Sequence, residues 1–86
     1  NKSNPEVIYW RSRMENEVAM FDSEFKLYDF RLGKSRAGEV ESLSFHLLIP
    51  HKYGMTDDEI RDALKKRMQI YKEDLKLEIL ILKSYI

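Results

Sequence analysis

Apolar residues recur at spacings of three and four near the start of the chain, and this period predicts a helix. Asn4 is a favoured N-cap and Pro5 a favoured first helical residue. The segment Val7–Trp10 also has high β propensity, but the apolar stripe continues well beyond it and stops before Asp22. We therefore predict a helix whose buried stripe comprises Val7, Trp10, Met14, Val18 and Phe21.

Alternation of apolar and polar residues predicts two strands in the middle of the chain. The first covers Phe25–Leu32, with an irregularity near Tyr28 and Asp29. A turn from Gly33 to Glu39 follows, with two glycines. The second strand alternates strictly and ends at Pro50, because proline has no backbone donor for a sheet ladder. Its apolar face is formed by Leu43, Phe45, Leu47 and Ile49, and Ser44 and His46 lie on the other face.

The last third of the chain predicts a second helix and a third strand. Thr56 is a good N-cap, acidic residues follow it, and basic residues come a few positions later, as the helix dipole favours. The buried stripe of this helix is predicted to comprise Ile60, Ala63, Leu64, Met68 and Tyr71. The final strand places Leu75, Leu77, Ile79 and Ile81 on one face, and Leu80 and Leu82 on the other. Since a strand that is apolar on both faces is normally covered on both, we expect something outside the chain to cover the second one.

The order helix, strand, strand, helix, strand predicts an α+β fold. We expect a single domain over residues 1–86, with a three-stranded mixed sheet and two helices on one face, of the ferredoxin-like or metallochaperone-like kind. The strand-helix-strand unit from 40 to 86 should form a right-handed crossover. We expect it to place the last strand beside the first, so that Phe25–Leu32 is the central strand.

Composition removes several classes of function. Fifteen basic and fifteen acidic residues cancel, which removes the usual electrostatic argument for nucleic-acid binding. The absence of cysteine excludes a disulfide framework and thiolate metal sites. No apolar run approaches the roughly 20 residues that span a bilayer. Because the chain begins at Asn1 rather than methionine, we expect it to be an excised domain of a larger protein.

Few residues carry chemistry of their own. His46 is the candidate metal ligand, since imidazole is a common ligand, although a tight site takes about four ligands and a solvent-facing histidine is the alternative. The acids from Asp57 to Glu59 are explained by the helix N-terminus. Neither His46 nor His51 has a serine and an acid at a recognisable spacing, so we predict no enzyme activity. Three basic residues lie near the first turn, with aromatic neighbours: Arg31, Lys34 and Arg36. A solvated turn, or a contact with anionic lipid or an acidic partner, explains them; a surface for single-stranded nucleic acid is the alternative.

Four segments resemble the cytoplasmic C-terminal domain of cation diffusion facilitator transporters. Residues 21–30 (FDSEFKLYDF) are similar to the passage from its first helix into its first strand, where the family carries histidine-aspartate-leucine. Residues 42–50 (SLSFHLLIP) resemble its second strand, which commonly carries a histidine and ends near a proline. Asn4–Ile8 resembles the start of its first helix, and Ile60–Asp62 falls where a histidine-aspartate pair is frequent. The resemblance covers essentially the whole chain.

The resemblance implies a domain on the cytoplasmic face of the membrane that dimerises below its own transmembrane domain. In the family, divalent cations, often zinc, bind this domain and draw the protomers together. Here four usual histidine positions are changed, so that only His46 remains as a clear ligand for zinc or manganese; the four residues in their place are Tyr28, Gly33, Arg61 and Leu80.

We therefore expect the dimerisation and regulatory domain of a divalent metal cation efflux transporter, with a metal site that is degenerate or absent. The dimer would bury Leu80 and Leu82, with Ile86 at the end of the strand. Arg61 would supply a fixed positive charge in place of the ion and pair with an acid across the dimer. Two alternatives are a stand-alone interaction or small-ligand regulatory module and a nucleic-acid-binding ferredoxin-like domain. Because the net charge is zero, we expect that nucleic acid is not a partner.

Overall fold

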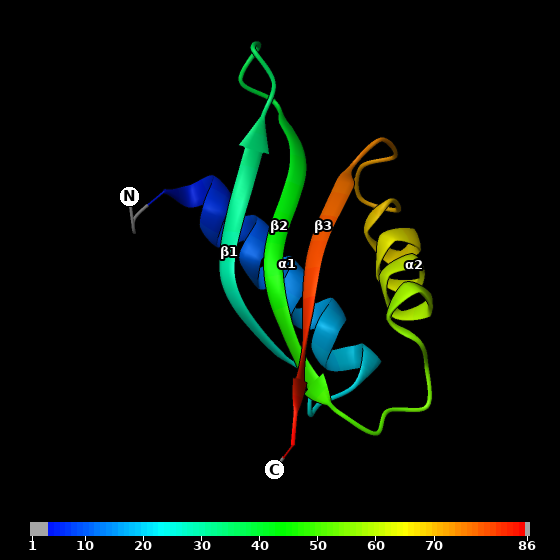
Figure 1. Cartoon of the computed structure of the whole chain (residues 1–86). Helices are drawn as coiled ribbons and strands as arrows, with labels where there is room; N and C mark the ends of the chain where they lie inside the picture. Colours follow the sequence, from blue (N-terminus) through cyan, green and yellow to red (C-terminus); the bar gives the residue numbers. More distant parts are fainter. Residues whose placement is uncertain (1–3, 86) are drawn as a thin grey trace.

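Two helices and three strands follow one another in the order α-β-β-α-β. The computed structural model describes residues 4–85, and its elements are α1 (Pro5–Phe21), β1 (Lys26–Lys34), β2 (Val40–Pro50), α2 (Asp57–Met68) and β3 (Lys76–Ser84) (Figure 1). The strands form one mixed sheet, in which β2 pairs antiparallel with β1 and parallel with β3. The predicted α+β class, element order and mixed three-stranded sheet are confirmed.

The central strand is β2, because the strand order across the sheet is β1-β2-β3. The prediction that Phe25–Leu32 is central is therefore wrong. The connection through α2 returns the chain to the free edge of β2 instead of passing over it to β1. The composition of β1 agrees with an edge position, since Lys26, Asp29 and Arg31 interrupt its apolar residues and it carries an irregularity in pairing. Charges and bulges are both typical of edge strands.

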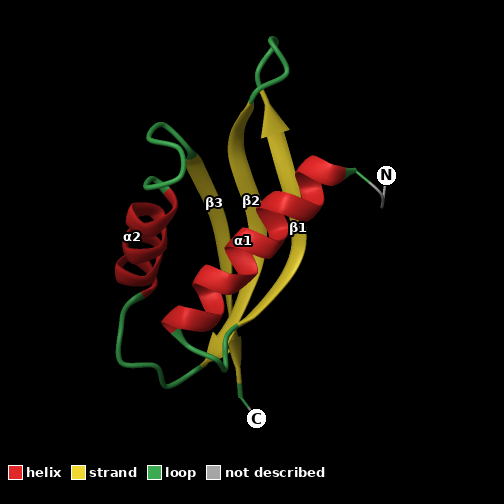
Figure 2. Cartoon of the chain, turned by 180° about the vertical axis from the view of Figure 1, so that it is seen from behind, coloured by secondary structure: helices red, strands yellow, loops and turns green. Residues whose placement is uncertain are grey.

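Both helices lie on the same side of the sheet. Figure 2 shows α1 running diagonally across this side and α2 lying beside β3. From the other side, in Figure 1, the strands lie in front of α1 and no helix covers them. The expected placement of the helices on one face is confirmed, and it leaves the second face of the sheet bare.

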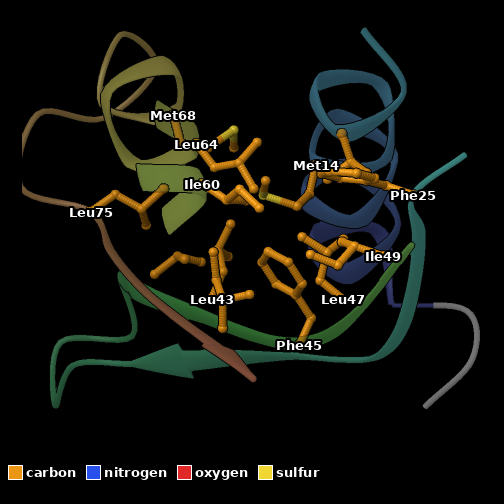
Figure 3. Packing of buried hydrophobic residues seen from close by; sticks show 13 residues of the cluster. Met14, Phe25, Leu43, Phe45, Leu47, Ile49, Ile60, Leu64, Met68 and Leu75 are labelled. Atoms are coloured by element: carbon orange, nitrogen blue, oxygen red, sulfur yellow. The ribbon is translucent and has the colours of Figure 1, made fainter. Parts of the chain in front are cut away.

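The core fills the space between the sheet and the helices (Figure 3). Alternate residues of β2 point into it and are buried: Leu43, Phe45, Leu47 and Ile49. The helices contribute Met14, Val18, Ile60, Leu64 and Met68. The predicted stripe of the second helix fails at Tyr71, because α2 ends at Met68 and the Tyr71 residue is 39% exposed. Its hydroxyl lies 2.7 Å from Glu17 Oε2 and donates a hydrogen bond to it.

A capping box begins α2. Thr56 Oγ1 accepts a hydrogen bond from the Glu59 backbone N–H at 3.1 Å, and Glu59 Oε1 accepts one from the Thr56 N–H at 2.9 Å. These bonds satisfy two donors that the helix cannot satisfy itself.

Replacing Thr56 with alanine is expected to lower the free energy of unfolding by about 1 kcal/mol, because one of these bonds is lost. Urea denaturation followed by circular dichroism measures the change. The Thr56→Ser variant keeps the accepting oxygen and should stay close to the parent. Equal losses in the two variants would show that the cap is not the cause.

Candidate functional site

The bare side of the sheet, which we call the open face, presents side chains in rows that run across the strands. Three of these rows contain a side chain from every strand; in a further row, Gly33 has no side chain beside Ser42 and Lys76. Strand pairing puts one residue from each strand in register, and neighbours in a row point to the same side. The first row contains Lys26, Leu48 and Leu82; the second contains Tyr28, His46 and Leu80; the third contains Arg31, Ser44 and Glu78.

The first two rows of the open face are largely apolar. Tyr28 and Leu80 are each 52% exposed, and Leu82 is 41% exposed. They lie together across two rows, with His46 between Tyr28 and Leu80. Apolar side chains thus gather on this side of the sheet although it faces away from the core. The sequence-based expectation that Leu80 and Leu82 share a face opposite the core is confirmed.

A bulge in β1 brings an acid beside His46. The pairing of β1 with β2 shifts between Tyr28 and Arg31, and Asp29 adopts a left-handed backbone conformation with a φ of 56°. Asp29 Oδ2 lies 3.6 Å from His46 Nε2, and Asp29 Oδ1 accepts a hydrogen bond from Arg31 Nη2 at 3.2 Å. Aspartate tolerates this conformation better than most residues, and the bulge re-aims its side chain.

A shallow hollow of about 620 Å³ crosses the open face at the level of these residues. Its lining includes the charged middle of β1, the middle of β2 and β3, and one side chain from α2. The residues that bear polar groups there are Asp29, Arg31, Ser44, His46, Arg61 and Glu78.

The hollow contains few donors for a metal ion. Within residues 4–85 there is no group of three or more His, Cys, Asp or Glu side chains placed to hold one. His46 and Asp29 together offer one imidazole and one carboxylate, whereas a tight zinc site takes about four ligands. A cation that binds here would need further ligands from water or from a second molecule.

Arg61 lies at the rim of the hollow, and its guanidinium binds its own chain. Arg61 Nε donates to the backbone carbonyl of Ile79 at 3.1 Å, and Nη1 donates to Asp58 Oδ1 at 3.1 Å. The bond to Ile79 holds α2 against β3. The role predicted for Arg61 across a dimer stays a prediction, and the Arg61→Ala variant tests it. The companion prediction for Ile86 lies outside the described residues.

Two features of the structure escaped the sequence interpretation. One is Glu78, whose position two residues before Leu80 places it on the open face. The other is Glu17, which is buried at 6% exposure in α1 and joins α1 to the end of α2. Its carboxylate accepts hydrogen bonds from Arg67 and from the Tyr71 hydroxyl. Its position beside Val18, on the border of the apolar stripe, was the signal for a partnered acid.

The surroundings of Glu17 act on its pKa in opposite directions. Removal from water is the largest effect and raises the pKa. Hydrogen bonds from Tyr71 and Arg67, together with the charges of Arg67 and Arg13, outweigh it and leave the pKa lowered from 4.5. The folded chain therefore holds Glu17 as a carboxylate at neutral pH.

No helix within the described part of the chain is long and apolar enough to cross a membrane. Comparisons with protein-family models, with curated proteins and with solved structures gave no match.

Proposed function

We propose that this chain is the cytoplasmic dimerisation and regulatory domain of a divalent metal cation efflux transporter, with a degenerate metal site. Its partners are a second copy of the chain and the transmembrane domain of its own protein. The open face is the proposed dimer surface. Two features support this function: the second row of the open face, and the self-complementary character of that face.

The observation that carries the proposal is the row of Tyr28, His46 and Leu80. The resemblance to the transporter family gives histidines to the positions of Tyr28 and Leu80, which are far apart in the sequence. The strand register places both directly beside His46. Directly opposite residues have Cβ atoms about 5 Å apart, which is close enough for their side chains to bind one ion. Gly33 and Arg61, the other two changed positions, lie outside the row.

The open face also suits a second copy of the chain. Apolar residues occupy most of two of its rows, and both signs of charge occupy the third. The chain has equal numbers of acidic and basic residues, so two copies carry no net repulsion. Burial of apolar surface between them is worth about 25 cal/mol per Å² before the cost of association is subtracted.

Replacing Leu80 with lysine is expected to raise the dissociation constant of the dimer roughly a hundredfold or more. A two-fold dimer contains the position twice, and each lysine must be desolvated where a leucine was buried. Sedimentation velocity over a range of protein concentrations measures the constant. The matched control is Ile70→Lys, since Ile70 is 83% exposed and lies beyond the end of α2, away from the open face.

A monomeric parent chain, or a Leu80→Lys variant that associates as tightly as the Ile70→Lys control, would contradict the dimer surface. Isothermal titration with zinc and with manganese tests the metal site in the same samples. We expect the dimer to be unaffected by either ion. Stoichiometric binding that tightens the dimer and disappears in the His46→Ala variant would show an intact sensor instead.

The transporter context has its own test. Expression of the whole reading frame that contains this chain should restore growth of a metal-efflux-deficient bacterium on zinc or manganese. The Leu80→Lys substitution in that frame should weaken the rescue, and Ile70→Lys should not. A dimeric domain whose reading frame gives no metal resistance would favour the stand-alone interaction or small-ligand module.

A further inference from the structure

The third row of the open face carries opposite charges at its two ends. Arg31 of β1 and Glu78 of β3 lie in register on either side of Ser44 in β2. Strands in a sheet are about 4.8 Å apart, so the two backbones are separated by roughly 10 Å. Both residues are exposed, and the Arg31 side chain is 72% exposed.

The two charges differ in what they bind within the chain. Arg31 donates to Asp29 Oδ1 through Nε at 3.3 Å and through Nη2 at 3.2 Å. Glu78 has no ion-pair partner among residues 4–85. One carboxylate oxygen cannot accept from all the N–H groups of the Arg31 guanidinium, so some of them remain available to a partner. An unpaired acid thus stands at one end of the row and a cation with spare donors at the other.

Two-fold symmetry turns this arrangement into a complementary one. Consider a two-fold axis that is parallel to β2 and lies midway between two facing sheets. It places each row opposite the same row of the partner, with the order of the three strands reversed. The β1 end of one copy then faces the β3 end of the other. Two sheets that pack face to face keep their strands within about 30° of each other, which preserves this superposition near the axis.

We propose that two copies pack through their open faces about an axis along β2, and that Arg31 of each copy pairs with Glu78 of its partner. The pairing rests on the proposed dimer function, and it specifies the orientation of that dimer. The apolar rows are superposed by the same operation, which brings Tyr28 of one copy over Leu80 of the other. The contact needs no metal ion, because fixed charges and apolar side chains fill the rows that a cation would otherwise hold together.

The test uses two charge reversals in separate chains, Arg31→Glu and Glu78→Arg. In a homodimer of either variant, both pairs become like-charged, which is strongly unfavourable; we expect the dissociation constant to rise roughly a hundredfold. In an equimolar mixture, each pair of the mixed dimer again joins opposite charges. At one pair both substituted positions meet, and at the other both native side chains meet. The mixed dimer should therefore form with nearly the affinity of the parent, in the presence of a chelator. Sedimentation velocity with one chain labelled measures it.

The control is a second mixture with the same changes of net charge at distant sites. Lys66→Glu lies on the exposed side of α2, and Glu73→Arg lies in the loop before β3. Each of these variants should dimerise like the parent, and mixing them should give no more than a few-fold gain. Circular dichroism of all four variants checks that each remains folded.

The outcomes separate this pairing from the dimer itself. A monomeric parent overturns both proposals. A parent dimer that either reversal leaves unchanged, or that mixing does not restore, overturns the pairing and its axis while the open-face dimer stands. Restoration by mixing cannot come from a contact within one chain, because neither variant chain carries opposite charges at the two positions. A mixed dimer that forms only with zinc or manganese present would overturn the metal-independent contact.

Discussion

Replacing Leu47 with alanine is expected to lower the free energy of unfolding by about 2–5 kcal/mol, whereas the same change at Leu80 should cost less than about 1 kcal/mol. Leu47 is fully buried at 0% exposure on the core side of β2. Leu80 is 52% exposed on the open face. Both positions lie within paired strands, and burial is the main difference between them.

The measurement is urea denaturation at protein concentrations where the parent chain is monomeric. A typical domain has a total stability of only about 5–15 kcal/mol, so Leu47→Ala should shift the midpoint strongly. Similar losses at the two positions would mean that Leu80 is buried even in the monomer, and would contradict an exposed open face.

Replacing Arg67 with alanine is expected to lower the free energy of unfolding by about 3 kcal/mol, because the buried carboxylate of Glu17 loses the cation that it binds directly. The Tyr71 hydroxyl continues to donate to Glu17 at 2.7 Å, but a neutral donor does not balance the charge. The matched variant Glu17→Gln removes the charge and keeps an acceptor, and the Arg67 side chain is 41% exposed to water. The Glu17→Gln variant should therefore lose less stability, about 1 kcal/mol.

The same pair makes stability depend on pH in a defined direction. The pKa of Glu17 is lowered in the folded chain from 4.5. Its ionised form therefore contributes stability that is fully present above pH 4.5 and is lost as the pH falls through the lower, folded pKa. Unfolding measured from neutral pH down through that folded pKa should show a steeper loss in the parent than in Glu17→Gln. Parallel curves for the two chains would contradict this origin.

Most of the fold could be predicted from local pattern, and the sheet order could not. The alternation of β2 and the spacing of Ile60, Leu64 and Met68 fix each element's type and its buried side. Local pattern does not predict which strands pair, because β2 pairs with β3 through residues about 34 positions away. Nothing local distinguishes that pairing from one with β1. The charges of β1 were the available clue, since a strand interrupted by Lys26 and Asp29 suits an edge.

The candidate site was predictable to the extent that it follows strand alternation. Alternation gives Leu80 and Leu82 their common face and puts His46 opposite the core. It does not give register, so the coincidence of Tyr28, His46 and Leu80 in one row required the structure. The bulge at Asp29 was expected, but its left-handed backbone and its approach to His46 depend on how the strand is paired on either side of the bulge. Glu17 was overlooked because its partners come from the far end of α2 and the turn after it.

The parallel pairing of β2 with β3 also has a consequence for how the chain acquires its structure. The β1-β2 hairpin joins neighbours and can close early, since short loops close quickly. The pairing of β3 must wait until α2 and its flanking loops have been made, and it spans a longer stretch of sequence. During synthesis, the edge of β2 that pairs with β3 therefore stays unpaired until residues 76–84 have left the ribosome. We expect refolding experiments to show protection of hairpin amides before those of β3.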